Sequence, residues 1–158
     1  MKPSELLERT LDYSETIDRT KYYPYSEHWH MPWEHTSPTD QLKDKKQKRC
    51  FACLGGFHYV RAGLKPGDRL TGFRLHNARL PIGIHNQAEV LNHLRCGNLG
   101  HACIELRITL SQKQGNVFLD WRDENMPADC LKWEGWKEWN IVAKKFAKMA
   151  EFLKTIDL

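Results

Sequence analysis

The clearest hydrophobic pattern lies near the C-terminus, where apolar residues recur every three or four positions. The series consists of Trp139, Val142, Phe146, Met149, Leu153 and Ile156. Lysines lie largely off this series. The spacing predicts an amphipathic helix with one apolar stripe facing a core.

Two further segments show the same helical period. Leu6, Thr10, Tyr13 and Ile17 predict a helix that begins with Ser4 as its N-cap and ends near Arg19. A second helix is expected from a cap at Asn86 to Leu94, with Val90 and Leu91 on its apolar side.

The stretch 50–60 is the most apolar part of the first half. Phe51, Leu54 and Phe57 fit a buried helix, in which Gly55 and Gly56 would let a second helix approach closely. Leu70, Phe73 and Leu75 indicate a short strand.

Residues 104–110 alternate between apolar and polar side chains, which predicts a half-buried strand. After a turn at 113–116, residues 117–121 can return as its hairpin partner. The competing interpretation is a helix that contains Ile104 and Ile108.

The remaining stretches carry little periodicity. Prolines interrupt residues 21–40, which are expected to form an irregular aromatic loop. Residues 43–49 are a basic solvated loop or an exposed helix start. The whole pattern predicts an α+β fold, with residues 1–158 forming a single helix-rich globular domain that has a small antiparallel sheet or hairpin.

Composition places the chain among folded soluble proteins. Of its 158 residues 41% are hydrophobic and 28% charged, and no apolar run approaches the roughly 20 residues that span a bilayer. Since no secretory signal is visible, we expect a cytoplasmic protein whose 5 cysteines are thiols or metal ligands rather than disulfides. The net charge of +4 falls short of a strongly basic nucleic-acid binder.

A set of cysteines and one histidine is the first candidate for chemistry. It comprises the CxxC pair Cys50 and Cys53, followed by Cys96, His101 and Cys103. Four such ligands can hold zinc, but a second CxxC is absent from the sequence. Buried core thiols are therefore the favoured interpretation of Cys50 and Cys53, and no cofactor is expected.

A metal-dependent hydrolase is a further alternative. It would use His28, His30, Asp120 and Asp123. Hydrogen-bonded histidines and a charged loop explain the same residues more simply. No catalytic triad spacing, nucleophile elbow, P-loop or GxGxxG is present, so the sequence favours a protein that is not an enzyme.

Binding surfaces form the last group of candidates. The basic positions are Lys43, Lys45, Lys46, Lys48 and Arg49, and the aromatic positions are Tyr23, Trp29, Trp33, Trp133 and Trp136. Cations beside stackable rings suit single-stranded nucleic acid, and the same composition suits a protein interface. The basic run is also typical of a merely solvated face.

Two short motifs carry a resemblance to a known group. The segment 49–56, Arg-Cys-Phe-Ala-Cys-Leu-Gly-Gly, and the pair Trp139-Asn140 opening the last helix resemble motifs of small phage and mobile-element proteins. Those proteins carry Cys-Cys-Leu-Gly and a late Asn-Asp, whereas this chain separates the cysteines and has Ile141 after Asn140. The resemblance implies a phage-like origin and a structural role for the patch.

The leading functional hypothesis is therefore a phage or mobile-element accessory protein. It would bind a host protein or ribonucleoprotein and inhibit a defence complex such as CRISPR-Cas. A nucleic-acid-binding module built on residues 43–49, and the metal-dependent hydrolase, are the alternatives.

Overall fold

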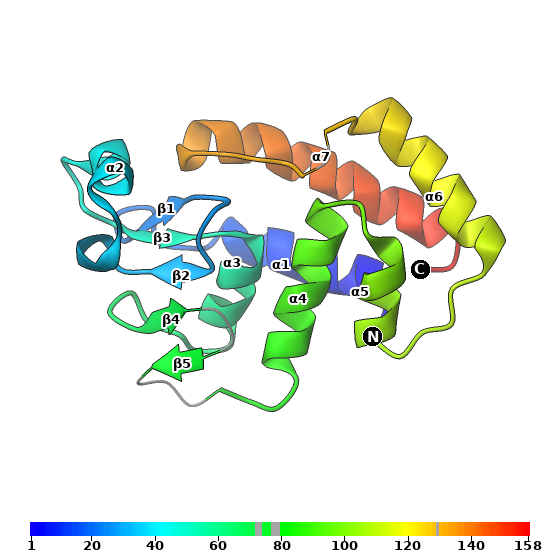
Figure 1. The fold of residues 1–158 in the computed structure, drawn as a ribbon, viewed down its shortest axis with the longest axis horizontal. Coiled ribbons are helices and arrows are strands. Elements are labelled where there is room, and N and C mark those ends of the chain that lie inside the picture. The colour runs from blue at the N-terminus through cyan, green and yellow to red at the C-terminus, as the bar shows by residue number, and fades with distance from the viewer. Residues whose placement is uncertain (72–73, 77–79, 129) are drawn as a thin grey trace.

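The long C-terminal helix α7 (Gly135–Thr155) packs along helix α1 (Pro3–Ser14) in the computed structural model (Figure 1). The structure describes residues 1–71, 74–76, 80–128 and 130–158. The predicted stripe is confirmed, because Trp139, Val142, Phe146, Met149 and Leu153 are all buried. Ile156 follows the helix and is half-buried.

Helix α1 is shorter than its pattern predicts. Ser4 is buried in the first turn and is not the cap; Lys2 holds the N-cap position. At the other end the Ser14 hydroxyl donates to the Leu11 carbonyl at 2.6 Å, and the Thr16 hydroxyl donates to the Tyr13 carbonyl. Such local bonds compete with helix continuation, so the helix ends at Ser14 although Ile17 is still buried.

The middle of the chain contributes four more helices. They are α3 (Leu54–Arg61), α4 (Ile84–Arg95), α5 (Leu99–Glu105) and α6 (Gln112–Asn125). Helix α4 confirms the helix expected between residues 86 and 94, with Gly83 rather than Asn86 at its N-cap. Helices α3, α4 and α5 pack in sequence order.

A small sheet lies at the end of the molecule opposite the two chain termini (Figure 1). Its strands are β1 (Tyr22–Pro24), β2 (His30–Met31), β3 (Cys50–Ala52), β4 (Arg69–Thr71) and β5 (Arg74–His76). Their order is β1-β3-β2-β4-β5; among the described residues the β1–β3 pair is parallel and the other pairs are antiparallel. The fold is thus α+β and helix-rich, as predicted, but the sheet is mixed rather than antiparallel.

The sheet uses segments that the sequence assigned differently. The predicted aromatic loop 21–40 supplies β1 and β2, followed by the short helical segments η1 (Trp33–His35), α2 (Pro38–Gln41) and η2 (Leu42–Asp44). The predicted strand at 70–75 corresponds to the antiparallel pair β4 and β5; Phe73 of that prediction lies outside the described residues.

The predicted helix at 50–60 begins later than expected. Residues 50–52 form the strand β3, and α3 begins after Cys53, whose sulfur accepts a hydrogen bond from the Gly56 amide. The two glycines make room mainly for Trp29 rather than for a helix. A Cβ at Gly56 would overlap the Trp29 carbonyl oxygen, and one at Gly55 would overlap the indole ring.

The predicted strand 104–110 and hairpin partner 117–121 are wrong. Ile104 lies in the last turn of α5 and is 69% exposed. Leu106, Ile108 and Leu110 are half-buried against the core, but they lie in the connection between α5 and α6 rather than in a strand. Residues 117–121 belong to α6, which begins at a capping box formed by Ser111 and Gln114. The competing helical interpretation holds for Ile104 but not for Ile108, which lies in the connection between the helices.

One continuous hydrophobic cluster joins α1, α3, α4, α5, α6 and α7 with β1 and β3. The chain ends meet beside it, where the Ser4 amide donates to the Leu158 carbonyl at 3.0 Å. This packing leaves one face of α7 uncovered between α1 and α6.

Candidate functional site

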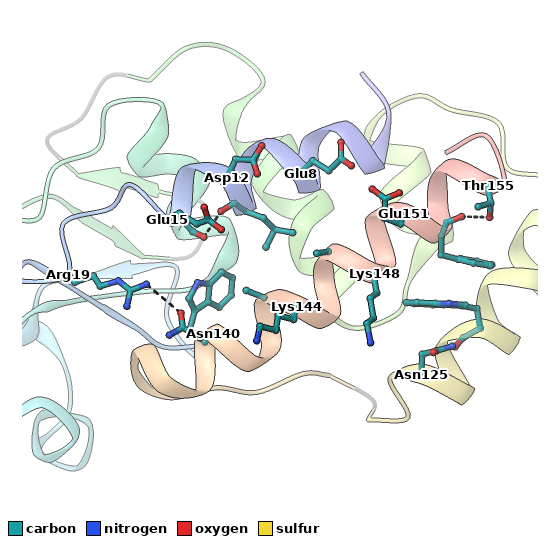
Figure 2. A pocket seen from close by; sticks show the side chains of 17 residues that line it. Glu8, Asp12, Glu15, Arg19, Asn125, Asn140, Lys144, Lys148, Glu151 and Thr155 are labelled. Atoms are coloured by element: carbon teal, nitrogen blue, oxygen red, sulfur yellow. Dashed lines mark hydrogen bonds between the residues drawn. The ribbon is translucent and has the colours of Figure 1, made fainter.

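A groove of about 1200 Å³ runs along the uncovered face of α7 (Figure 2). We call it the α7 groove. Helix α1 and the turn after it form one side, and α6 closes one end. Its lining residues are Glu8, Leu11, Asp12, Ser14, Glu15, Arg19, Trp121, Asn125, Trp139, Asn140, Ala143, Lys144, Ala147, Lys148, Glu151, Phe152 and Thr155.

The groove has charged sides and a floor of small residues. On the α1 side stand Glu8, Asp12 and Glu15, four and three positions apart, which places them on one helix face. Figure 2 shows Lys144 and Lys148 pointing from α7 away from α1. Between these two charged rows lie the α7 floor residues Ala143 and Ala147.

Each end of the groove is held by specific contacts. Near the C-terminal end of α7, the Trp121 and Phe152 rings stack at 4.9 Å between centroids. Lys154 pairs there with both Glu8 and Glu151. At the other end the Arg19 guanidinium lies 4.4 Å over the Trp136 ring.

Several groove charges lack an internal partner. Within the described part of the chain, no ion pair involves Asp12, Glu15, Lys144 or Lys148. Unpaired acidic and basic rows on opposite sides of one groove form a surface that can complement a partner carrying the opposite arrangement of charges.

The predicted basic segment is partly used inside the molecule. Arg49 forms two hydrogen bonds of 3.0 Å to the Asp44 carboxylate and a third to the Arg19 carbonyl. Lys43 pairs with Glu134 at 2.9 Å. These two cations therefore fix the segment in place, whereas Lys45, Lys46 and Lys48 are exposed.

The predicted aromatic positions separate into different environments. Trp33 is half-buried, donates to the Gln41 carbonyl, and has the Lys48 ammonium 5.0 Å above its ring. Tyr23 packs edge-on against Phe51, and Trp29 packs edge-on against Tyr59. Trp33 and Lys48 share a crevice of about 300 Å³.

Trp133 and Trp136, the other two aromatic candidates for a binding surface, pack into the protein. Trp133 is only 1% exposed and packs on Trp139 and Phe146. Trp136 is half-buried, stacks on Phe57, and donates to the Tyr22 carbonyl at 2.8 Å. Trp136 lies in the first turn of α7, three positions before the buried Trp139, whereas Trp133 lies in the segment that precedes the helix.

The cysteines correct the expectation that all of them are thiols or metal ligands. Cys96 and Cys130 form a disulfide, because the turn after α4 and the segment before α7 bring their Cα atoms within 4.1 Å. Cys50, Cys53 and Cys103 are buried thiols. This bears out the core interpretation of the CxxC pair, and burial raises the pKa of each of these three thiols.

The proposed zinc set is not assembled. His101 is exposed and contacts Asn98, while Cys96 is bonded to Cys130. Among the described residues, no group of three or more His, Cys, Asp or Glu side chains is arranged to hold a metal ion.

The residues of the hydrolase hypothesis lie on distant elements. His30 is fully buried in the sheet, while Asp120 and Asp123 are exposed on α6 at the far end of the molecule (Figure 1). His28 lies near the sheet and pairs with Asp40 at 2.8 Å. The structure therefore does not bring these four residues together.

His30 has a structural environment that also sets its protonation. Its Nδ1 lies 2.8 Å from the Asp68 carbonyl, which can only accept, so Nδ1 carries the proton. Nε2 then accepts from the Tyr22 hydroxyl at 3.0 Å. Burial lowers the pKa of His30 to about 4, so the ring is neutral at pH 7.

Sequence reasoning missed the α7 groove. Its signal was present in the acidic positions of the first helix and in the pair Lys144 and Lys148 on the last helix. What the sequence could not supply was the pairing of these two helices, which puts both rows beside one floor.

The fold and the groove define a helix-rich α+β protein with an open polar-edged groove. Comparisons with protein-family models, curated proteins and solved structures found no match for the chain. In the part of the chain that the structure describes, no helix combines the length and apolar character needed to cross a bilayer.

Proposed function

We propose that this protein is a non-enzymatic binding protein whose α7 groove receives a segment of a partner macromolecule. The groove itself carries the proposal. Its volume of about 1200 Å³ exceeds the roughly 300–1000 Å³ of small-molecule sites. The half-buried stacked rings of Trp121 and Phe152 at one end supply the kind of anchor contacts that dominate protein interfaces.

The partner class comes from the sequence. The resemblance to phage and mobile-element proteins supports a host protein or ribonucleoprotein as the partner. Inhibition of a defence complex such as CRISPR-Cas is the corresponding biological outcome of the proposal.

A capture experiment with a groove variant tests this function. Tagged protein is incubated with a bacterial lysate, with nuclease-treated and high-salt arms in parallel. Ala147→Arg places a long charged side chain on the floor of the groove. Asn116→Arg adds the same side chain at an exposed position of α6 that does not line the groove. Both positions are exposed, so stability should change by no more than about 0.5 kcal/mol.

We expect wild type and Asn116→Arg to retain the same host protein or complex in both arms. Ala147→Arg should retain about tenfold less, which corresponds to about 1.4 kcal/mol. Equal retention by all three proteins would contradict a role for the groove.

A nucleic-acid-binding function is the second candidate. It is supported by the exposed lysines 45, 46 and 48 and by the position of Lys48 over Trp33. It predicts binding of a labelled single-stranded oligonucleotide that weakens steeply with salt, because phosphate contacts release counterions. Anisotropy titrations of wild type and of a variant with these lysines changed to Glu measure this. Salt-insensitive binding, or equal binding by the variant, would rule it out.

A further inference from the structure

The elements around the α7 groove limit what kind of chain can bind there. Its sides and floor are mainly helical, and an α-helix uses its backbone hydrogen-bonding groups internally. A peptide that binds as an added β-strand needs a free sheet edge for its amides and carbonyls, which these helices do not provide. A helical peptide satisfies its backbone by itself.

The length and depth of the groove also suit a helix. From Asn140 to Thr155 the lining follows α7 for about 22 Å, which is about four helical turns. Ala143 and Ala147 lie one turn apart on the floor. Their small side chains allow a helix axis to approach to the 8–10 Å or so that is usual for packed helices.

The charges on the two sides favour a particular pattern on that helix. Asp12 and Glu15 stand on the α1 side, and Lys144 and Lys148 lie on the other side of the floor (Figure 2). Within the described chain these four have no ion-pair partner, whereas Glu8 and Glu151 share Lys154. Each row repeats at three or four positions, which matches the spacing of side chains along one face of a helix.

We propose that the α7 groove binds one amphipathic α-helix of the partner protein, with basic residues on the flank beside α1 and acidic residues on the flank beside Lys144 and Lys148. Small and apolar residues of that helix lie on Ala143 and Ala147, and one larger apolar residue packs against the stacked rings of Trp121 and Phe152. This inference rests on the proposed function and specifies its partner.

A displayed library of helical peptides tests the pattern without knowledge of the natural partner. The probe is a library about 16 residues long, with randomised charges on both flanks of an apolar stripe. Peptides that bind the Ala147→Arg variant are first removed from the library, and the remaining peptides are then selected for binding to the full-length wild-type protein. A second selection uses the variant Asp12→Lys, Glu15→Lys, and circular dichroism checks that each variant keeps the wild-type helical signal.

We expect wild type to enrich peptides with apolar residues at i, i+3, i+4 and i+7, one basic flank and one acidic flank. An enriched peptide should lose about tenfold in affinity for the Asp12→Lys, Glu15→Lys variant, because the two acidic side chains that face its basic flank become basic. Reversing the basic flank of the peptide to Glu should restore its affinity for that variant.

Enrichment of nothing, of peptides without helical periodicity, or of peptides that bind the charge variant equally well would overturn the proposed helix. These outcomes are distinguishable from a failure of the proposed function. If lysate capture still depends on position 147 while the library yields no such helix, the groove binds a partner of another kind. If capture is insensitive to Ala147→Arg, the proposed function itself fails.

Discussion

His30 shows how one buried side chain links local geometry to the pH dependence of stability. Burial lowers its pKa from 6.5 to about 4, so at pH 5 the unfolded chain binds a proton that the folded protein does not. The contribution of His30 to the free energy of unfolding is therefore fully present above pH 6.5. It falls as the pH drops toward 4, by about 1.4 kcal/mol per pH unit.

We predict that His30→Gln weakens this pH dependence. Glutamine can still donate to the Asp68 carbonyl and accept from Tyr22, but it does not titrate. Urea unfolding at pH 7 and pH 5 measures the difference in the free energy of unfolding. That difference should be about 2 kcal/mol smaller in the variant than in wild type. An unchanged difference would mean that His30 is not the titrating group.

Gly56 makes the close approach of Trp29 possible. We predict that Gly56→Ala destabilises the protein by about 3 kcal/mol, because the new Cβ would overlap a backbone oxygen that cannot rotate away. Gly100→Ala is the control: it is also helical, its nearest neighbour would be 3.9 Å away, and alanine favours helix by about 1 kcal/mol. In thermal unfolding, Gly56→Ala should have a lower Tm than wild type and Gly100→Ala a higher one. Equal Tm values for the two variants would contradict the close packing of Trp29 on Gly56.

At the scale of elements, strongly periodic segments could be predicted from sequence and short ones could not. The apolar residues of α7 recur at helical spacing and so predict which face of the helix is buried. In contrast, the alternation at 104–110 resembles a strand, but the caps at Asn98 and Ser111 decide the local structure. The strands β1 and β2 were missed because two or three residues are too few to show a period.

The capping box of α6 offers a test of this correction. We predict that Ser111→Ala lowers the free energy of unfolding by about 1 kcal/mol, because the Gln114 amide loses its acceptor at 3.1 Å. Thr109→Ala, at an exposed position outside the helix, should change it by less than about 0.5 kcal/mol. Urea titrations compare the two, and an equal effect would argue against a helix that starts at Ser111.

At the scale of the whole molecule, the disulfide connects the turn after α4 to the segment that leads into α7. Its partners are 34 residues apart, so it restricts the unfolded chain and should contribute about 2–4 kcal/mol. Alkylation under denaturing, non-reducing conditions should modify Cys50, Cys53 and Cys103 only. Modification of all the cysteines, or an unchanged unfolding midpoint after reduction, would contradict this role.

The α7 groove also belongs to this scale, because its lining combines α1 with α6 and α7, which are far from α1 in sequence. Its acidic and basic residues recur at three or four positions along the sequence of α1 and α7. Their proximity depends on long-range packing, which periodicity alone does not specify.

The most direct test of docking at the groove is site-specific photocrosslinking in bacterial cells. A photoreactive phenylalanine is placed at Ala147 in the groove, at Lys46 in the basic segment, or at Asn116 as the control. We expect one discrete protein adduct from position 147 and none from the other two. Adducts from position 46 alone, or equal labelling at all three positions, would contradict docking at the groove.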